Sequence, residues 1–451
     1  MISTETLSAI RFGYGPGGRD VPPDAATHIA RLKRGDRMVG RYPTPDLEAA
    51  IALGEDHRKA RKAAQDGGSD RGRRQAQVKL GEMFGSALMA GFARIAETDD
   101  PLRERLTWFW ADHFTAVPTN AVTRAVVPDY IDSAIRPHVT GRFSDMLVAV
   151  VTHPLMLIYL DQIASVGPNS PVGQRRGRGL NENLAREVLE LHTLGVEGPY
   201  SQRDVTQLAE LFTGLSGQQG KGFVFRQGIV EPGAETVLGR QYGGGRPSLA
   251  PIRAVLADLA VHPATAAHVS RKLAVHFVAD EPDPALVAAM EAAWLETGGD
   301  LMAVTQAMLE HPAVWEAPLT KVRQPHDFFG ATLTALGISG DELMAVPVRD
   351  ARRNFIRPLR DMGQPFMTAP GPDGWPETAE HWVTPLGLAN RIVWAFEAAR
   401  HVADRAGDTG AFVTRALGDA ASDRLRWAAG VAETREEALA LVLASPEFNR
   451  R

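Results

Sequence analysis

The segment NENLAREVLELHTLG at residues 181–195 contains the densest group of side chains that could do chemistry. Glu187 and Glu190 lie three residues apart, and His192 follows closely. Two carboxylates beside an imidazole can activate water and protonate a leaving group, and they can also ligate a divalent metal ion. We therefore predict Glu187 and Glu190 as catalytic carboxylates and, together with His192, as metal ligands.

Two further residues of this segment suit the binding of a substrate. Arg186 could bind an anionic group during catalysis, and Asn183 shares a helix face with Glu187 and Glu190. The alternative is structural: Arg186 and Glu190 pair within one helix, Asn183 and Glu187 bond to neighbouring backbone, and His192 caps the carboxyl end. The sequence leaves both interpretations open.

A helix must position these side chains. Asn181 can cap its start and Gly195 can end it, and apolar residues recur between them at three- and four-residue spacing. On such a helix Glu187 and His192 lie about 140° apart, so one straight helix does not aim both at one ion. A metal site would therefore need donors from a second helix, as in helical bundles.

The segment FWADHF at residues 109–114 offers such donors on an amphipathic helix predicted over 101–115. We predict Asp112 as a fourth metal ligand and His113 as a catalytic imidazole. The alternative for His113 is a core position, because a histidine inside an aromatic run is usually buried with a single hydrogen bond.

A second polar cluster is the segment APGPDGWPETAEHW at residues 369–382. Glycine and proline restrain this loop, and an exposed tryptophan is unfavourable unless it stacks on a sugar or another flat apolar face. We predict Trp375, His381 and Trp382 as substrate-binding residues. The alternative is that both indoles are buried beneath the loop.

The composition excludes several classes of protein. The 451 residues carry a net charge of −5, so no nucleic-acid partner is expected, and the absence of cysteine excludes thiolate catalysis and disulfides. No apolar run approaches the roughly 18 residues of a membrane span. The amino-terminal residues lack the pattern of a secretory signal, so the chain as written is expected to be cytoplasmic.

The hydrophobic periodicity predicts a mainly α, bundle-like fold with one small β-hairpin insertion within 222–239. We expect a main helical domain over 1–335 and a carboxyl-terminal helical subdomain over 336–451 packed on it. Four His-Pro or Ser-Pro pairs come after apolar helical runs and predict helix-to-helix corners. They lie in VTHPLM, AVHPAT, LEHPAV and LASPEF.

Motifs along nearly the whole chain resemble a large bacterial family catalogued as domain of unknown function 1800. They are IRFGYGP, FWADHF, YLDQ, NENLAREVLELHTLGVEGPYSQRDVTQLAELFTG, RKLAVHFVADEP, PGPDGWP and the terminal LASPEFNRR. The resemblance brings no established activity. It implies Asn more often than Asp at position 112, and His-Asp in the hairpin where this chain has VEPG.

The resemblance also implies a setting, because members are frequently encoded beside exported proteins similar to sulfatases and phosphatases, and many carry signal peptides. Our leading hypothesis is a hydrolase-like enzyme dependent on a divalent metal or on carboxylate and histidine groups, with a polar cleft between the helices of FWADHF and NENLAREVLELH. The alternative is a non-catalytic partner or glycan-binding scaffold of a sulfatase-like or phosphatase-like protein, using Trp375, Trp382 and the basic loop 174–178. Export to the periplasm with such a partner is the second possibility for its location.

Overall fold

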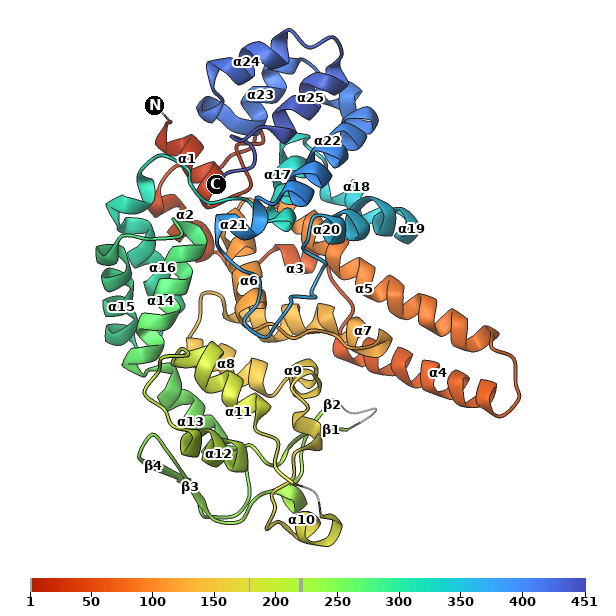
Figure 1. The fold of residues 1–451 in the computed structure, drawn as a ribbon, viewed down its shortest axis with the longest axis vertical. Coiled ribbons are helices and arrows are strands. Elements are labelled where there is room, and N and C mark those ends of the chain that lie inside the picture. The colour runs from red at the N-terminus through yellow and green to blue at the C-terminus, as the bar shows by residue number, and fades with distance from the viewer. Residues whose placement is uncertain (1, 178, 219–221) are drawn as a thin grey trace.

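The computed structural model describes residues 2–177, 179–218 and 222–451. Within these residues the fold is mainly α, as predicted, and its β structure consists of two small antiparallel sheets. The molecule is elongated, with the carboxyl-terminal helices at one end and both sheets at the other (Figure 1). No helix in the described part of the chain combines the length and apolar character that crossing a membrane requires.

The first half of the chain is built from helices of very different length. In order they are α1 (Thr4–Arg11), α2 (Ala25–Leu32), α3 (Met38–Arg41), α4 (Leu47–Gln65), α5 (Arg71–Glu97), α6 (Pro101–His113), α7 (Ala121–Asp129), the π-helix η1 (Tyr130–Ile135), η2 (Arg136–His138), α8 (Phe143–Val151), α9 (Pro154–Tyr159), η3 (Gln162–Ala164), α10 (Pro171–Arg176), α11 (Asn183–Glu187), the π-helix η4 (Val188–Thr193) and α12 (Gln202–Leu211). Helices α4 and α5 form a long hairpin that projects from the body (Figure 1).

The second half of the chain contains the sheets and the remaining helices. They are β1 (Leu215–Gln218), β2 (Gly222–Phe225), η5 (Gln227–Ile229), β3 (Ala234–Val237), β4 (Arg240–Gly243), α13 (Ala250–Ala260), α14 (Pro263–Phe277), α15 (Pro284–Thr297), α16 (Leu301–Glu310), η6 (Pro312–Trp315), α17 (Pro325–Ala335), α18 (Gly340–Met344), α19 (Val348–Ala351), the π-helix η7 (Arg352–Ile356), α20 (Arg357–Asp361), α21 (Ala379–Trp382), α22 (Pro385–Ala406), α23 (Thr409–Leu417), η8 (Gly418–Ala420), α24 (Asp423–Gly430) and α25 (Arg435–Ala444).

The two β-prone runs within 222–239 do form strands, but they do not pair with each other as predicted. Strand β2 pairs with β1, which precedes it, and β3 pairs with β4, the next strand along the chain. The turn between β3 and β4 is Leu238-Gly239, and both residues have positive φ. Positive φ at both central residues is the geometry of a type I′ turn, which matches the twist of a two-residue hairpin. This local turn places β3 against β4.

The three predicted His-Pro corners are confirmed, and the histidine before each proline caps the helix that begins there. At the fourth position, Ser445-Pro446, a turn follows α25 instead of a helix. The Nδ1 atoms of His153, His262 and His311 accept backbone N–H groups of α9, α14 and η6 at 3.1, 3.1 and 3.3 Å. Ser445 does the same through its hydroxyl oxygen, which accepts the Phe448 N–H at 3.1 Å. These histidines therefore have a structural role in the helix corners.

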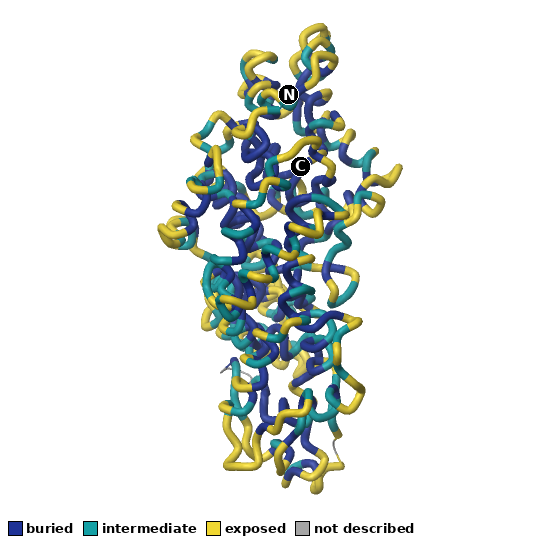
Figure 2. The backbone as a smooth tube through the Cα atoms, turned by 90° about the vertical axis from the view of Figure 1, so that its left-hand side faces the viewer, coloured by how far each residue is buried: buried dark blue, intermediate teal, exposed yellow. Residues whose placement is uncertain are grey.

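One apolar core runs along the molecule and includes residues from Phe12 to Phe448. Figure 2 shows buried backbone along the long axis, with exposed segments at the sides and both ends. The core contains residues from both sides of position 335. Helix α17 and helices α22–α25 pack against one another. A boundary at residue 335 between two domains stays a prediction.

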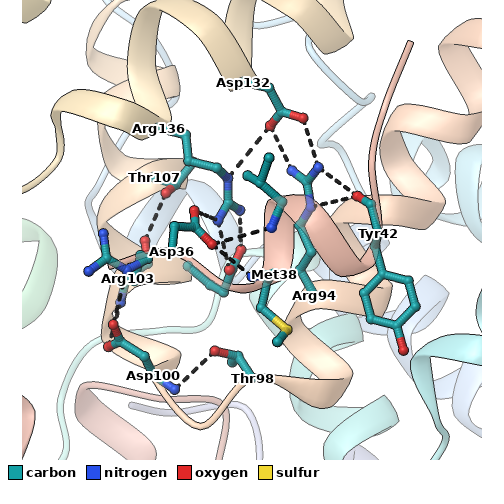
Figure 3. Close-up of polar contacts among 12 residues, drawn as sticks. Asp36, Met38, Tyr42, Arg94, Thr98, Asp100, Arg103, Thr107, Asp132 and Arg136 are labelled. Carbon is teal, nitrogen blue, oxygen red and sulfur yellow. Dashed lines mark hydrogen bonds and ion pairs between the residues drawn. The ribbon is translucent and has the colours of Figure 1, made fainter. Parts of the chain in front are cut away.

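A buried ion network fixes the start of α6 (Figure 3). Arg136 binds Glu104 of α6 with both terminal nitrogens and also binds Asp36 at 2.8 Å. Beside it, Arg94 of α5 makes two bonds to Asp132, at 2.6 and 2.7 Å. Bidentate pairs of this kind restrict geometry more than single contacts do. The network holds α6 rigidly, and the other end of α6 carries Asp112 and His113.

Candidate functional site

A cavity of about 250 Å³ with several ionisable side chains in its lining lies between α6, α14 and the loop that precedes α21. Its lining comes from three separate parts of the chain. It consists of Phe109, Asp112 and His113 from α6, His268, Arg271, Lys272 and Val275 from α14, and Asp373, Trp375 and Glu377 from the loop. The cavity has FWADHF as one wall, and its other walls are α14 and the loop 369–378, called the tryptophan loop below. The segment 181–195 does not line it, so it is not the hypothesised cleft between the helices of FWADHF and NENLAREVLELH.

Helix α14 presents its polar residues to the cavity by simple periodicity. His268, Arg271, Lys272 and Val275 lie at i, i+3, i+4 and i+7, which is one helix face. The opposite, apolar face is buried, and Phe277 packs near Phe109 with ring centroids 6.4 Å apart. The sequence analysis missed Lys272, although the spacing of His, Arg and Lys on one amphipathic helix was the available signal.

Asp112 is enclosed by the tryptophan loop. The backbone N–H of Trp375 donates to both of its carboxyl oxygens, at 3.0 and 3.2 Å. Burial raises the pKa of Asp112 to about 8, and the nearby charge of Glu377 acts in the same direction. At pH 7 the group is therefore a neutral carboxylic acid that can donate a hydrogen bond.

Lys272 faces the cavity without an ionic partner. Among the described residues, no carboxylate oxygen lies within 4.0 Å of its Nζ, although Asp112 and Glu377 line the same cavity. Burial lowers the pKa of Lys272, and the charges of Asp112, Glu377 and Asp373 only partly oppose this. The result is an amine that loses its proton more readily than an ordinary lysine does.

Two histidines, His113 of α6 and His268 of α14, join these helices to the segment 188–193. The Nε2 of His113 donates to the carbonyl oxygen of His192 at 3.2 Å, and the Nε2 of His268 donates to that of Leu191 at 3.2 Å. The segment is a π-helix here, and its last carbonyls lack partners within their own helix. His113 and His268 satisfy these carbonyls, so the segment braces the cavity wall through its backbone.

The side chain of His192 lies in the core. Its ring packs against Phe114 with centroids 5.0 Å apart, and burial lowers its pKa to about 3. Burial also lowers the pKa of His113. Both imidazoles are therefore neutral at pH 7.

Arg186 and Glu190 pair as in the structural alternative, whereas the Asn183 side chain does not bond to neighbouring backbone among the described residues. Arg186 pairs with Glu190 and with Glu182, each at 3.3 Å on the same helix, and Asn183 is exposed. Glu187 is half-buried, and burial followed by the charge of Glu190 raises its pKa to about 7. Glu187 does not line the cavity, but the charge of Asp373 at the cavity also raises its pKa.

The predicted metal ligands Glu187, Glu190, His192 and Asp112 are not assembled into one site. Within residues 2–177, 179–218 and 222–451, no three His, Asp or Glu side chains form a group that could hold a metal ion. The reason is packing: the His192 ring is in the aromatic core, and Asp112 is turned to the Trp375 backbone.

The two tryptophans of the loop have different environments. Trp382 is buried, and its Nε1 donates to the carbonyl oxygen of Pro376 at 2.8 Å. Trp375 is half-buried and lines the cavity, and His381 is exposed at the edge of Trp382 with ring centroids 4.7 Å apart. A platform of two exposed indoles is therefore not formed.

The alternative of a glycan-binding scaffold also used the basic loop 174–178. Helix α10, which contains most of that loop, lies at the far end of the molecule from α21 (Figure 1). Arg178 lies outside the described residues. The loop and the tryptophans therefore do not make one surface, and the sulfatase-like or phosphatase-like partner stays a prediction.

Gly374 allows the loop to approach Asp112. A Cβ at this residue would lie 2.8 Å from both the carbonyl oxygen and Oδ2 of Asp112, and its φ is +86°. We expect Gly374→Ala to lower the free energy of unfolding by about 2 kcal/mol and to shift the fluorescence of Trp375. Gly363→Ala is the matched control, because its φ is +95° but nothing lies within 4 Å of its Cβ. An equal loss in both variants would show that the contact with Asp112 is unimportant.

Glu377 anchors the end of the same loop. Its Oε1 contacts Nδ1 of His276 at 2.5 Å, and its Oε2 lies 3.2 Å from Nζ of Lys321 and 3.8 Å from Arg451. Lys321 also donates to the Glu377 carbonyl oxygen at 2.6 Å. Burial would raise the pKa of Glu377, but the charges and hydrogen bonds of His276 and Lys321 lower it to about 2. Glu377 therefore stays ionised and ties the loop to the core.

A family model described as "Protein of unknown function (DUF1800)" matches residues 9–450. The chain belongs to this family. The comparison with curated proteins found no match, and the comparison with solved structures found none.

The resemblance to the DUF1800 family implied two positions at which this chain departs from the family pattern, and the structure shows the surroundings of both. A neutral Asp112 has nearly the shape and hydrogen-bonding capacity of the Asn that is more usual there, so burial makes the exchange conservative. In VEPG, the Glu231 carboxylate accepts hydrogen bonds from the backbone and side chain of Asn169, at 2.9 and 2.5 Å. Glu231 therefore fixes the loop near residue 169.

Proposed function

We propose that this DUF1800 member is a hydrolase-like enzyme in which Lys272 is the base and Asp112 is a neutral hydrogen-bond donor. The observation that carries the proposal is the cavity itself, in which an amine without an ionic partner and a carboxyl group whose pKa is raised by burial face the same space. Titratable groups with displaced pKa values in a cavity are the usual feature of acid–base sites.

The roles depend on the protonation states. Asp112 donates a hydrogen bond to a carbonyl oxygen of the substrate and so stabilises the negative charge that develops there. Lys272 accepts a proton from a water molecule, the water oxygen bonds to the carbonyl carbon, and the bond to the leaving group breaks. Lys272 then returns the proton to the leaving group, which balances the reaction.

The other cavity residues bind and orient the substrate. Arg271 is exposed at the cavity and has no ion pair among the residues described, so it suits a carboxylate or another anionic group of the substrate. Trp375 lines the cavity and offers an apolar face to the substrate. Glu187 does not line the cavity, so its role as a catalytic base stays a prediction.

The first test is the reactivity of Lys272 itself. An amine-reactive label followed by peptide mass spectrometry should modify Lys272 at a lower pH than the exposed Lys79. Labelling at pH 11 shows whether the reagent can reach Lys272. If Lys272 is accessible but reacts no faster than Lys79 at lower pH, its role as the base is overturned.

The second test is turnover. A panel of chromogenic esters with and without a carboxylate group is screened, and Lys272→Met should lower kcat on any hydrolysed substrate by about 100-fold or more. Lys79→Met is the control for the loss of one lysine. A Lys272→Met variant with unchanged kcat would contradict the proposal.

A further inference from the structure

A second hollow of the molecule is lined by arginine. This groove of about 540 Å³ lies beside the segment RDARRNFIRPLR at residues 349–360. Its basic residues are Arg124 from α7, Arg349 from α19, Arg352 and Arg353 from η7, and Arg357 and Arg360 from α20. Its apolar lining consists of Phe84, Ile356, Pro365 and Phe366.

Local carboxylates pair with only three of these six arginines. Asp350 pairs with Arg353 at 3.5 Å, and Asp361 pairs with Arg357 and Arg360 at 3.4 and 2.9 Å. In the part of the chain that the structure describes, the remaining three arginines of the groove have no ion pair. Six guanidinium groups and two carboxylates leave a local charge of 6 − 2 = +4, although the whole chain carries −5.

The backbone concentrates the charge on one side. Arg349, Arg353 and Arg357 recur at four-residue spacing, and the π-helix η7 lies between α19 and α20 where they occur. All six arginines are exposed, so burial of their stems against a core does not explain their clustering. Like charges at this spacing destabilise a helix unless an anion lies between them. Single π turns of this kind occur frequently at functional sites.

We infer that the groove binds a small molecule that carries several phosphate or sulfate groups. Guanidinium groups bind tetrahedral oxyanions through two parallel N–H bonds, and several forks around one hollow suit several such groups. The volume lies in the range of pockets for discrete small molecules. The Phe84 and Phe366 rings, 5.2 Å apart, offer contact to the carbon skeleton of the ligand. The inference is independent of the proposed hydrolysis.

The test is isothermal titration calorimetry of the full chain with inositol hexakisphosphate and with inositol hexasulfate, in 50 mM salt. The two probes have the same skeleton, so the tighter one identifies the preferred oxyanion. We expect the variant Arg349→Gln, Arg352→Gln, Arg357→Gln to bind at least tenfold more weakly than the unaltered chain. The control Arg58→Gln, Arg61→Gln, Arg74→Gln removes the same charge from exposed sites on α4 and α5 and should change binding less than twofold.

Three results would overturn the inference. They are no binding of either probe to the unaltered chain at 1 mM, equal weakening in the groove variant and the control variant, and a single-stranded oligonucleotide that binds the groove more tightly than both probes. Thermal unfolding of each variant confirms that a loss of binding does not reflect a loss of structure.

Discussion

Glu377→Gln is expected to lower the free energy of unfolding at pH 7 by about 3 kcal/mol, because breaking a buried ion pair leaves charges without compensation. Lys321 and Arg451 are fully buried beside Glu377, and His276 is nearly so. Lys321 also pairs with Asp280 at 2.6 Å, and we expect this ion pair to remain in the variant. The loss of stability should therefore lie at the lower end of the range for a broken buried ion pair. Urea unfolding monitored by circular dichroism measures the difference.

The loss should depend on pH in a defined direction. The pKa of Glu377 is about 2 in the folded chain and near 4.3 when unfolded, so its stabilisation is complete above the unfolded value and disappears as pH falls towards 2. The difference between Glu377→Gln and the unaltered chain should therefore shrink between pH 4.5 and pH 2. Glu380→Gln, three residues away and exposed, is the control and should change stability by less than about 0.5 kcal/mol. Equal effects in the two variants would refute the role of Glu377 as an anchor.

Asp112→Asn is expected to make the folded chain more stable in alkali. The pKa of Asp112 is about 8 when folded and near 3.9 when unfolded. Its favourable contribution is therefore complete below the unfolded value and is lost as pH rises through 8, at up to about 1.4 kcal/mol for each pH unit. Asparagine stays neutral throughout and removes this dependence.

Unfolding in urea at pH 5, 7 and 9 tests this expectation, with Asp56→Asn as the control for an exposed aspartate. The advantage of Asp112→Asn should be largest at pH 9 and smallest at pH 5. Because asparagine also donates a hydrogen bond, the variant should keep most of any hydrolytic activity while the alkaline limb near pH 8 disappears from its pH profile. An unchanged difference in stability from pH 5 to pH 9 would show that Asp112 is ionised in the folded chain.

Most helices, their corners and the family could be determined from the sequence. Helix α6 starts at Asp100 and Pro101, which supply a cap and a first-turn proline, and the histidines before proline cap α9 and α14. The pair between Arg186 and Glu190 results from a spacing of four residues. These features depend on interactions within about one helical turn, so the local sequence specifies them.

The tertiary structure alone decided which residues share the candidate site. Lys272, Asp112 and Glu377 are far apart in the chain and meet only because α14 and the tryptophan loop pack on α6. The π-helix at 188–193 directs His192 into the aromatic core, so the strongest chemical motif of the sequence became a brace for the cavity. The charge states of Asp112 and Lys272 also depend on the tertiary structure. A carboxyl group or an amine takes its pKa from burial and neighbouring charges, and long-range packing sets both.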